Sequence, residues 1–240
     1  MIPAAVIIAG GIATRLRPMT ENTPKAMLPI AGKPFIAHQL SLLKRKGLQR
    51  VVICSGYLSR QIEDFVSDGS RFGLAVSFSV DGDKLLGTGG AVKKALPLLG
   101  KEFFVLYGDS YLNVDFISVY KYFHSRKAEG LMTVFKNRDA WDKSNIVFKD
   151  GKVAVYDKKN KTKDMEYIDY GLSLLESSVF RFMDKQEVFD LADFYKEMVS
   201  RGMMIGYEVS ERFYEIGSPE GFAETEAYLL NNTKAELKNG

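Results

Sequence analysis

The sequence predicts an α/β fold, with a mostly parallel central sheet flanked by helices. Short, fully apolar runs such as Ala5–Ala9 are typical of buried parallel strands. They alternate with amphipathic segments, the first at residues 34–47, where Ile36, Leu40 and Leu43 share one helical face. Four such strands and three helices fit into the first ~110 residues, so right-handed βαβ crossovers are expected.

The remaining elements follow from the same patterns. In the first half we expect strands at 51–54, 74–80 and 103–107, a helix through Ile62 and Val66, and a helix at 91–99 opened by the glycine-rich run LGTGG. In the second half we expect strands at 131–135, 171–175, 205–209 and 213–216 and helices at 191–201 and 219–230. A hairpin, 145–148 with 153–156, is expected around Asp150-Gly151. These strands form a small antiparallel lobe inserted in one domain over residues 1–230, and 231–240 should fray.

Composition excludes several classes of protein. The chain has 240 residues, 46% of them hydrophobic, which is too apolar for a disordered protein. A net charge of +3 without a basic cluster predicts neither nucleic-acid nor membrane binding. No apolar run reaches the ~18 residues of a membrane helix, and the single Cys54 lies in an apolar strand, which favours a buried, inert thiol. We therefore expect a cytoplasmic protein.

Charged residues follow several predicted strands, where parallel sheets bind their ligands. Gly10-Gly11 and Arg15 come after the first strand, and Lys25 follows them. Asp109 ends the run FFVLYGD, and Glu215 lies near another strand end. Cations that neutralise phosphate oxygens and carboxylates that hold Mg²⁺ suit phosphoryl or nucleotidyl transfer. Each residue alone also fits a plain structural role, such as a turn or a helix cap.

Taken together, these residues resemble a known family. The run AGGIATRLRPMTENTPKAMLPIAGKP, from Ala9 to Pro34, resembles the signature of the sugar-1-phosphate nucleotidylyltransferases, and LGTGGA, YGDSY, DYGLS and EIGSPEGF follow in the family's order. The short bacterial enzymes that activate heptose, mannose, glucose or N-acetylmuramic acid phosphates are similar. The resemblance implies the Rossmann-like nucleotide-diphospho-sugar transferase fold, with a nucleotide-binding half at 1–115 and a sugar-binding half at 116–230. It also implies a role in making nucleotide sugars for cell-envelope polysaccharides.

The resemblance also implies roles for individual residues. Arg15, Lys25 and Asp109 would be catalytic, and Asp109 and Glu215 would hold Mg²⁺. The nucleotide would be bound by Ala9, Gly10, Gly11, Thr14, Arg15, Gly87, Thr88, Gly89, Gly90 and Gly108. The sugar phosphate would be bound by Asn145, Asp157, Lys158, Tyr170 and Gly171, with the acid of Asp157 on a sugar hydroxyl. The expected partners are an NTP and a sugar-1-phosphate, and a homodimer is the assembly considered.

Four positions depart from the family pattern. Ala13 replaces a usual glycine and would be strained by roughly 1 kcal/mol if its φ is positive. Glu215 and Asp157 exchange the usual Asp and Glu, which changes the reach of each carboxylate. Tyr170 puts an aromatic ring where a small residue is usual, and so predicts a ring near the sugar.

The implied reaction is a single in-line displacement at the α-phosphorus of the NTP, without a covalent enzyme intermediate. Two alternatives stay open. RLRPMTENTPKA also resembles the start of phosphocholine cytidylyltransferases, although LGTGGA is similar to the sugar enzymes. A non-catalytic nucleotide-sugar-binding regulatory protein would not need the metal carboxylates. A Rossmann dehydrogenase is excluded by the glycine spacing. The sequence leaves the base, the sugar and the oligomeric state undetermined.

Overall fold

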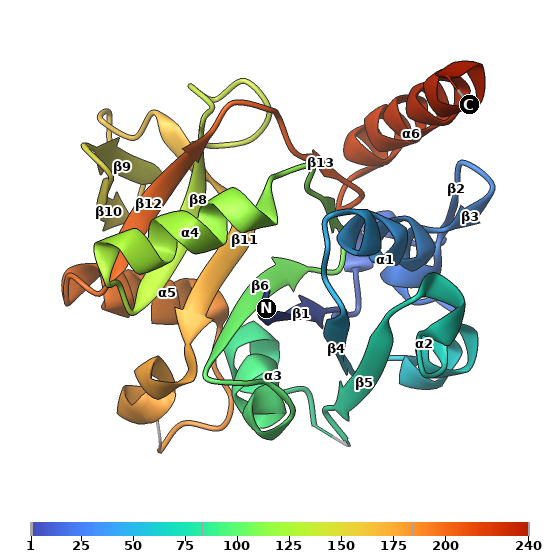
Figure 1. Ribbon diagram of the computed structural model, residues 1–240, viewed down its shortest axis with the longest axis horizontal. Helices are drawn as coiled ribbons and strands as arrows, with labels where there is room; N and C mark the ends of the chain where they lie inside the picture. Colours follow the sequence, from blue (N-terminus) through green and yellow to red (C-terminus); the bar gives the residue numbers. More distant parts are fainter. Residues whose placement is uncertain (1, 83, 184, 240) are drawn as a thin grey trace.

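The computed structural model describes residues 2–82, 84–183 and 185–239, with side chains as far as residue 232. Within these ranges a nine-stranded mixed sheet, of order β5-β4-β1-β6-β11-β8-β12-β10-β9, forms the centre of the molecule (Figure 1). Its strands are β1 (Ala4–Ile8), β4 (Arg50–Ser55), β5 (Ala75–Val80), β6 (Glu102–Tyr107), β8 (Gly130–Lys136), β9 (Ile146–Lys149), β10 (Lys152–Tyr156), β11 (Tyr167–Glu176) and β12 (Met204–Val209). Two short pairs lie outside it: β2 (Pro29–Ile30) with β3 (Lys33–Pro34), and β7 (Ser110–Tyr111) with β13 (Tyr214–Glu215).

The first half of the chain is the predicted parallel unit. β1 pairs in parallel with both β4 and β6, and β5 extends the sheet beyond β4. The helices are α1 (Phe35–Arg45), α2 (Ser59–Val66), α3 (Gly87–Ala95), α4 (Phe116–Arg126), α5 (Leu191–Ser200) and α6 (Pro219–Asn239). The carboxyl ends of β1, β4, β5 and β6 therefore meet at one edge of the sheet, where ligands bind in such folds.

The antiparallel strands continue the same sheet. β11 pairs antiparallel with both β6 and β8, and β12 runs parallel to β8. The predicted hairpin is present as β9 and β10, with positive φ at Asp150 (51°) and Gly151 (76°), as a two-residue turn of twisted strands requires. The expected antiparallel strands are thus present and continue the central sheet, because β11 pairs with both β6 and β8.

Alternating side chains of the central strands form two cores. Val6 of β1 belongs to a cluster with residues of α3 and α5, whereas Ala5 and Ile7 belong to a cluster with residues of α1 and α4. The period-two alternation of a strand separates these side chains to opposite faces. The sheet is therefore covered on both faces, which explains the uninterrupted apolar runs in the sequence.

Three predicted boundaries are corrected. α3 begins at Gly87 and not near Ala91, so the glycines of LGTGG lie inside the helix. A Cβ at Gly90 would collide with the carbonyl oxygen of Glu187, so close packing accounts for a glycine there. β11 begins at Tyr167, before the expected residue 171, and α6 extends past the expected end near Leu230 to Asn239.

The expectation of a buried thiol at Cys54 is confirmed. Cys54 is buried, and burial, assisted by the charge of Asp81, raises the pKa of its thiol to about 12. Its Sγ donates to the carbonyl oxygen of Ala91 at 3.3 Å. Among the helices of the described residues, none combines the length and the apolar character needed to cross a membrane.

Candidate active site

Main-chain atoms that follow three neighbouring strands, β1, β4 and β5, pack closely together at one edge of the sheet. Gly10 follows β1 and lies against the backbone of Gly56, which follows β4; a Cβ at Gly10 would be 3.2 Å from the Gly56 nitrogen. Asp81 follows β5, and its Oδ2 would lie 3.3 Å from a Cβ at Gly56. Gly11 has nothing within 4 Å of its Cβ position and is exposed. This edge is therefore open at Gly11 and built from closely packed backbone at Gly10.

Gly217 marks the point where the predicted phosphate and metal residues meet. A Cβ on Gly217 would lie 3.3 Å from an Nη of Arg15 and 3.4 Å from Oδ2 of Asp109. It would also collide with Oε2 of Glu215. Arg15, Asp109 and Glu215 come from three separate segments, so the fold brings one cation and two carboxylates to one small region. Gly217 was not singled out from the sequence, although it lies in the quoted run EIGSPEGF.

Lys25 joins this group through an ion pair with Asp109. Its Nζ lies 2.5 Å from Oδ2 of Asp109, and the two side chains are 21% and 22% exposed. Burial by itself raises the pKa of Asp109, but the charge and hydrogen bond of Lys25, with a further bond from Ser110, outweigh it. The pKa of Asp109 is therefore lowered, and the carboxylate stays ionised at neutral pH.

Glu215 lies on β13, which pairs with β7, and its carboxylate accepts hydrogen bonds from the residues that follow it. Oε2 accepts a short hydrogen bond from the Gly217 backbone N–H, and Oε1 accepts one from the Ser218 hydroxyl at 3.2 Å. Burial, followed by the nearby charge of Asp109, raises the pKa of Glu215 against these bonds. β13 pairs with β7 through Glu215 and Ser110, so the two carboxylates are neighbours by strand register.

Two carboxylates suit Mg²⁺, which commonly binds one or two protein carboxylates and completes its shell with substrate phosphates and water. The described part of the chain holds no cluster of three or more His, Cys, Asp or Glu that would bind a metal without such help. Asp109 and Glu215 therefore fit a metal that arrives with phosphate groups.

Gln39 of α1 supports the turn that carries Asp109, and the sequence did not indicate this role. Its buried Nε2 donates to the carbonyl oxygens of Tyr107 at 2.9 Å and Ser110 at 2.7 Å. These carbonyls lie on either side of Asp109. A helix on one face of the sheet thus holds the main chain of the strand end in place.

The loop after β1 contains the strained alanine. Ala13 has φ 53° and ψ 47°, in the left-handed region, so the conditional strain foreseen from the sequence applies. Its carbonyl oxygen accepts from the Thr20 hydroxyl at 2.8 Å and from the Leu16 N–H at 3.2 Å. Thr14 follows it and is exposed, like Arg15. The strained residue therefore shapes the loop that presents Arg15.

The other predicted nucleotide residues are mostly committed to main-chain contacts. Ala9 N–H donates to the Cys54 carbonyl at 2.7 Å, and Gly108 N–H donates to the Ile8 carbonyl at 2.8 Å. The structure thus places Ala9 and Gly108 as spacers between adjacent strands, with no free amide for a ligand.

The predicted nucleotide residues Gly87, Thr88, Gly89 and Gly90 form the start of α3. The N–H groups of Gly89 and Gly90 both donate to the Phe189 carbonyl oxygen, at 3.0 and 3.3 Å. A Cβ on Gly87 would lie 2.6 Å from that same oxygen. The start of α3 is therefore bound to the segment before α5, while the preceding Leu85 and Leu86 approach Gly56 and Asp81.

The predicted sugar-phosphate residues gather at the end of β10 and along β11. Nζ of Lys158 lies 3.5 Å from Oδ2 of Asp169, whose side chain is 2% exposed. Oδ1 of Asn145 accepts from the Asp169 N–H at 3.0 Å, and Oδ1 of Asp169 accepts from the Gly171 N–H at 3.0 Å. The buried Asp169, which the sequence analysis did not select, connects three residues that it did.

This group lies next to Asp109. The Lys158 ammonium is 5.3 Å from the centre of the Tyr107 ring, two residues before Asp109. A Cβ at Gly171 would lie 3.7 Å from Oγ of Ser110, which donates to Oδ1 of Asp109 at 3.2 Å. One continuous site therefore extends from Arg15 to Lys158.

Two predicted sugar contacts are placed differently from the expectation. The carboxylate of Asp157 accepts from Lys196 Nζ at 2.7 Å and from the N–H groups of Lys159 and Asn160. The Lys196 bond, followed by these backbone bonds, lowers its pKa. It is thus turned toward α5, and contact with a sugar hydroxyl requires Lys196 to release it.

The ring of Tyr170 does not line the site as expected. It is 2% exposed and packs edge-on against Phe213, with ring centres 6.1 Å apart. Tyr170 alternates with Asp169 along β11, so the two side chains leave opposite faces of the strand. Tyr170 therefore belongs to the core on the α1 and α4 face.

Main-chain atoms at parallel strand ends, with cations and two carboxylates around them, are the arrangement expected of a protein that binds a nucleoside triphosphate or a similar phosphate. The family model described as nucleotidyl transferase matches residues 4–232. The chain belongs to this family.

Named relatives and solved structures agree with this assignment. A D-glycero-alpha-D-manno-heptose 1-phosphate guanylyltransferase of Campylobacter jejuni is 29% identical over 95% of this chain and 99% of its own. An N-acetylmuramate alpha-1-phosphate uridylyltransferase of Neisseria meningitidis is 42% identical, over 49% of this chain and 51% of its own. The crystal structure of HddC from Yersinia pseudotuberculosis superposes with a TM-score of 0.81, covering 95% of this chain and 99% of that one at 24% identity. That structure supports the nucleotide-diphospho-sugar transferase fold.

Proposed function

We propose that this protein transfers a nucleoside monophosphate from an NTP to a sugar-1-phosphate and releases pyrophosphate. An oxygen of the sugar phosphate attacks the α-phosphorus; that P–O bond forms as the bond to the pyrophosphate oxygen breaks. The convergence of Arg15, Asp109 and Glu215 at Gly217 carries this proposal, because it puts charges of both signs where a triphosphate reacts. Lys158, at the other end of the site, supplies a cation for the acceptor phosphate.

The protein groups act by binding and orientation. Arg15 and Lys25 neutralise phosphate oxygens, and the open backbone at Gly11 allows the nucleotide to approach closely. Lys158, held against Asp169, orients the attacking phosphate. No nucleophile of the protein is required, since positioning and charge stabilisation account for catalysis in such reactions.

Mg²⁺ is the proposed cofactor, with Asp109 and Glu215 as its protein ligands. When bound, the ion would neutralise charge on the phosphates during the displacement. Lys25 now holds Oδ2 of Asp109, and Gly217 and Ser218 hold Glu215. These contacts hold both carboxylates beside Gly217 until a nucleotide enters.

For the nucleotide we propose GTP. Oδ1 of Asp81 is a buried carboxylate oxygen without a hydrogen-bond partner among the described residues, while its Oδ2 accepts from the Leu86 N–H at 3.1 Å. Guanine presents two adjacent donors, N1–H and N2–H, to such a carboxylate, whereas uracil presents one. The guanylyltransferase relatives from Campylobacter jejuni and Aneurinibacillus thermoaerophilus match over nearly their whole length, which favours a heptose- or mannose-type acceptor.

UTP with N-acetylmuramate 1-phosphate is the second candidate. The observation in its favour is the higher identity, 42%, to the uridylyltransferase of Neisseria meningitidis, although that match covers only 118 residues. The two candidates differ in both base and sugar, so one substrate matrix separates them.

The deciding experiment measures pyrophosphate release with Mg²⁺ across ATP, GTP, CTP, UTP and dTTP. The acceptors are heptose, mannose, glucose and N-acetylmuramic acid 1-phosphates, with phosphocholine added. Asp109→Asn is the blank. Release with one sugar-1-phosphate that disappears in the blank establishes the activity and names both substrates. Release with phosphocholine and CTP would support the cytidylyltransferase alternative. Tight binding of a nucleotide sugar without any turnover would support the regulatory alternative.

A further inference from the structure

The helix α5 makes polar contacts at its first residues with the start of α3. Oδ1 of Asp190, the residue before α5, accepts from the Thr88 hydroxyl at 2.5 Å, and the Leu191 N–H donates back to the same Thr88 oxygen at 2.8 Å. The adjacent Phe189 carbonyl accepts from both Gly89 and Gly90. These bonds fasten α5 to the segment that follows Leu85 and Leu86, beside the proposed base site.

The same helix contacts the turn that carries Lys158. Asp193 lies 3.0 Å from Lys159 Nζ, and Lys196 Nζ lies 2.7 Å from Oδ2 of Asp157. Asp193 and Lys196 are three residues apart and so share one face of the helix. Their ion pairs with Lys159 and Asp157 bind the turn on both sides of Lys158.

The buried face of α5 supports this same region. The ring of Tyr195 packs edge-on against Tyr156, with centres 6.2 Å apart, and Lys158 Nζ lies 5.9 Å from the Tyr156 ring centre. Phe194 stacks on Phe180 at 4.5 Å, which anchors the middle of the helix. α5 is therefore packed along its length and contacts both proposed substrate regions.

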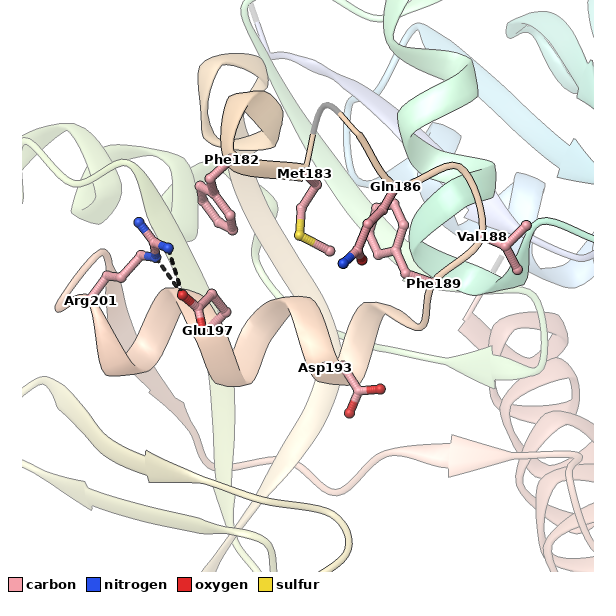
Figure 2. Close-up of a pocket in the computed structure, with 8 residues that line it drawn as sticks. All are labelled: Phe182, Met183, Gln186, Val188, Phe189, Asp193, Glu197 and Arg201. Carbon is pink, nitrogen blue, oxygen red and sulfur yellow. Dashed lines mark hydrogen bonds and ion pairs between the residues drawn. The ribbon is translucent and has the colours of Figure 1, made fainter.

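A groove lies along the outer side of α5. Its volume is about 550 Å³, and residues of α5 and of the segment with Met183, Gln186 and Val188 line it (Figure 2). Phe182 of that segment stacks on Phe194 of α5, with ring centres 5.2 Å apart. Directly after the last residue of α5, Arg201 pairs with Glu197, within 2.7 Å, and lies over the ring of Phe182 (Figure 2). This last pair offers a matched control on the same helix.

We propose that Asp190 and Lys196 are positioning residues through which α5 couples the nucleotide site to the sugar-phosphate site. Binding at one site then changes the affinity of the other, a consequence that rests on the proposed function. A displacement at Thr88 that keeps its bonds to Asp190 and Leu191 moves the start of α5, and through Lys196 it reaches the turn at Asp157. The effect is reciprocal by thermodynamic linkage.

The first test needs no substrate. Amide hydrogen exchange is measured on the whole chain for Lys196→Met, Asp190→Ala and the control Arg201→Gln. Lys196→Met should speed exchange at Gly89 and Gly90 at least ~3-fold. Asp190→Ala, which removes the acceptor of the Thr88 hydroxyl, should do so at Lys159 and Asn160, as expected for linked local openings. The control should leave all four amides unchanged. Changes confined to the mutated end of the helix would overturn the link, and unchanged β1 amides exclude general unfolding.

The second test measures the coupling itself by calorimetry. Heptose 1-phosphate is titrated with and without α,β-methylene-GTP, which cannot react. The wild type should show at least a ~5-fold difference in Kd, at the lower end of typical coupling. Each single variant should bring this ratio near one, and the double variant should lose no more than either single one. A ratio unchanged in both variants, or a wild-type ratio of one, overturns the proposal.

The two tests separate the proposals from each other. If no substrate pair reacts in the matrix and neither probe binds, the proposed function fails, and the exchange experiment alone decides whether α5 links the two segments. If transfer occurs but exchange does not propagate along α5, only the positioning role of Asp190 and Lys196 fails.

Discussion

Lys25 and Asp109 form a 2.5 Å ion pair across 84 positions of sequence, between the loop after β1 and the end of β6. The pair keeps the Asp109 carboxylate ionised and fixes it near Arg15 and Glu215. The same ammonium is available to a phosphate oxygen once a triphosphate and its metal compete for Asp109. Lys25 therefore pairs with Asp109 in the free protein and binds a phosphate oxygen in the proposed reaction.

Lys25→Ala should lower turnover at least ~10²-fold, since charge stabilisation of this kind is worth several kcal/mol. Removing the ammonium also raises the pKa of Asp109, because burial then acts without its main opposing charge. The rate of pyrophosphate release measures the first effect and carboxyl titration by NMR the second. An unfolded product by circular dichroism would instead support a purely structural role.

Asp109→Asn should also lose at least ~10²-fold in turnover, because an amide is a poor ligand for the cation and carries no charge. The measurement is single-turnover formation of the nucleotide sugar at saturating substrates. Near-normal activity would remove Asp109 from the site. Asp115→Asn is a suitable control, because that carboxylate caps α4 and is exposed.

Glu215→Gln should raise the melting temperature at neutral pH while lowering activity. The folded-state pKa of Glu215 is raised, by burial first and then by Asp109, so its ionisation at neutral pH opposes folding. The protonated Glu215 carboxyl therefore adds to the free energy of unfolding. This contribution is complete below the pKa of the unfolded state, near 4.3, and is lost as pH rises through the pKa of the folded state. The gain over wild type should therefore shrink toward acid pH. A melting-temperature difference that is independent of pH would contradict this account.

Gly217→Ala should reduce activity strongly while the chain still folds. The new methyl group would contact Arg15 and Asp109 and collide with Glu215, so these three groups would have to separate. A misplacement of about 1 Å in such a site can cost on the order of 10²-fold in rate. Gly100→Ala is the control, since its Cβ would meet nothing closer than 3.9 Å. Equal activity of the two variants would refute the convergence at Gly217.

Ala13→Gly should stabilise the protein by about 0.5 kcal/mol. The left-handed conformation costs alanine roughly 1–2 kcal/mol, and the greater conformational entropy of glycine in the unfolded chain offsets about half of the gain. Ala223→Gly, at an exposed position in α6, should lose about 1 kcal/mol. Denaturant unfolding of both variants checks the opposite signs. A loss of stability in Ala13→Gly would show that the strain is relieved by other contacts.

Local patterns were enough to predict much of this molecule. Apolar runs ending at glycine identified β1, β4 and β6, and Asp150-Gly151 identified the β9–β10 hairpin, because strand burial and turn geometry depend on a few adjacent residues. The positions of Gly10 and Asp109 directly after strands also followed from the sequence. Their meeting at one edge of the sheet is a consequence of parallel pairing.

Only the tertiary structure decided how the charged side chains pair. Asp157 and Lys158 are adjacent in sequence, yet one carboxylate turns to Lys196 and the ammonium turns to the buried Asp169. The placement of Tyr170 in the core and the convergence at Gly217 were equally inaccessible from local pattern. The physical reason is that turn and strand preferences are set by neighbouring residues. The partner of a long charged side chain is instead set by the packing of segments far apart in the chain.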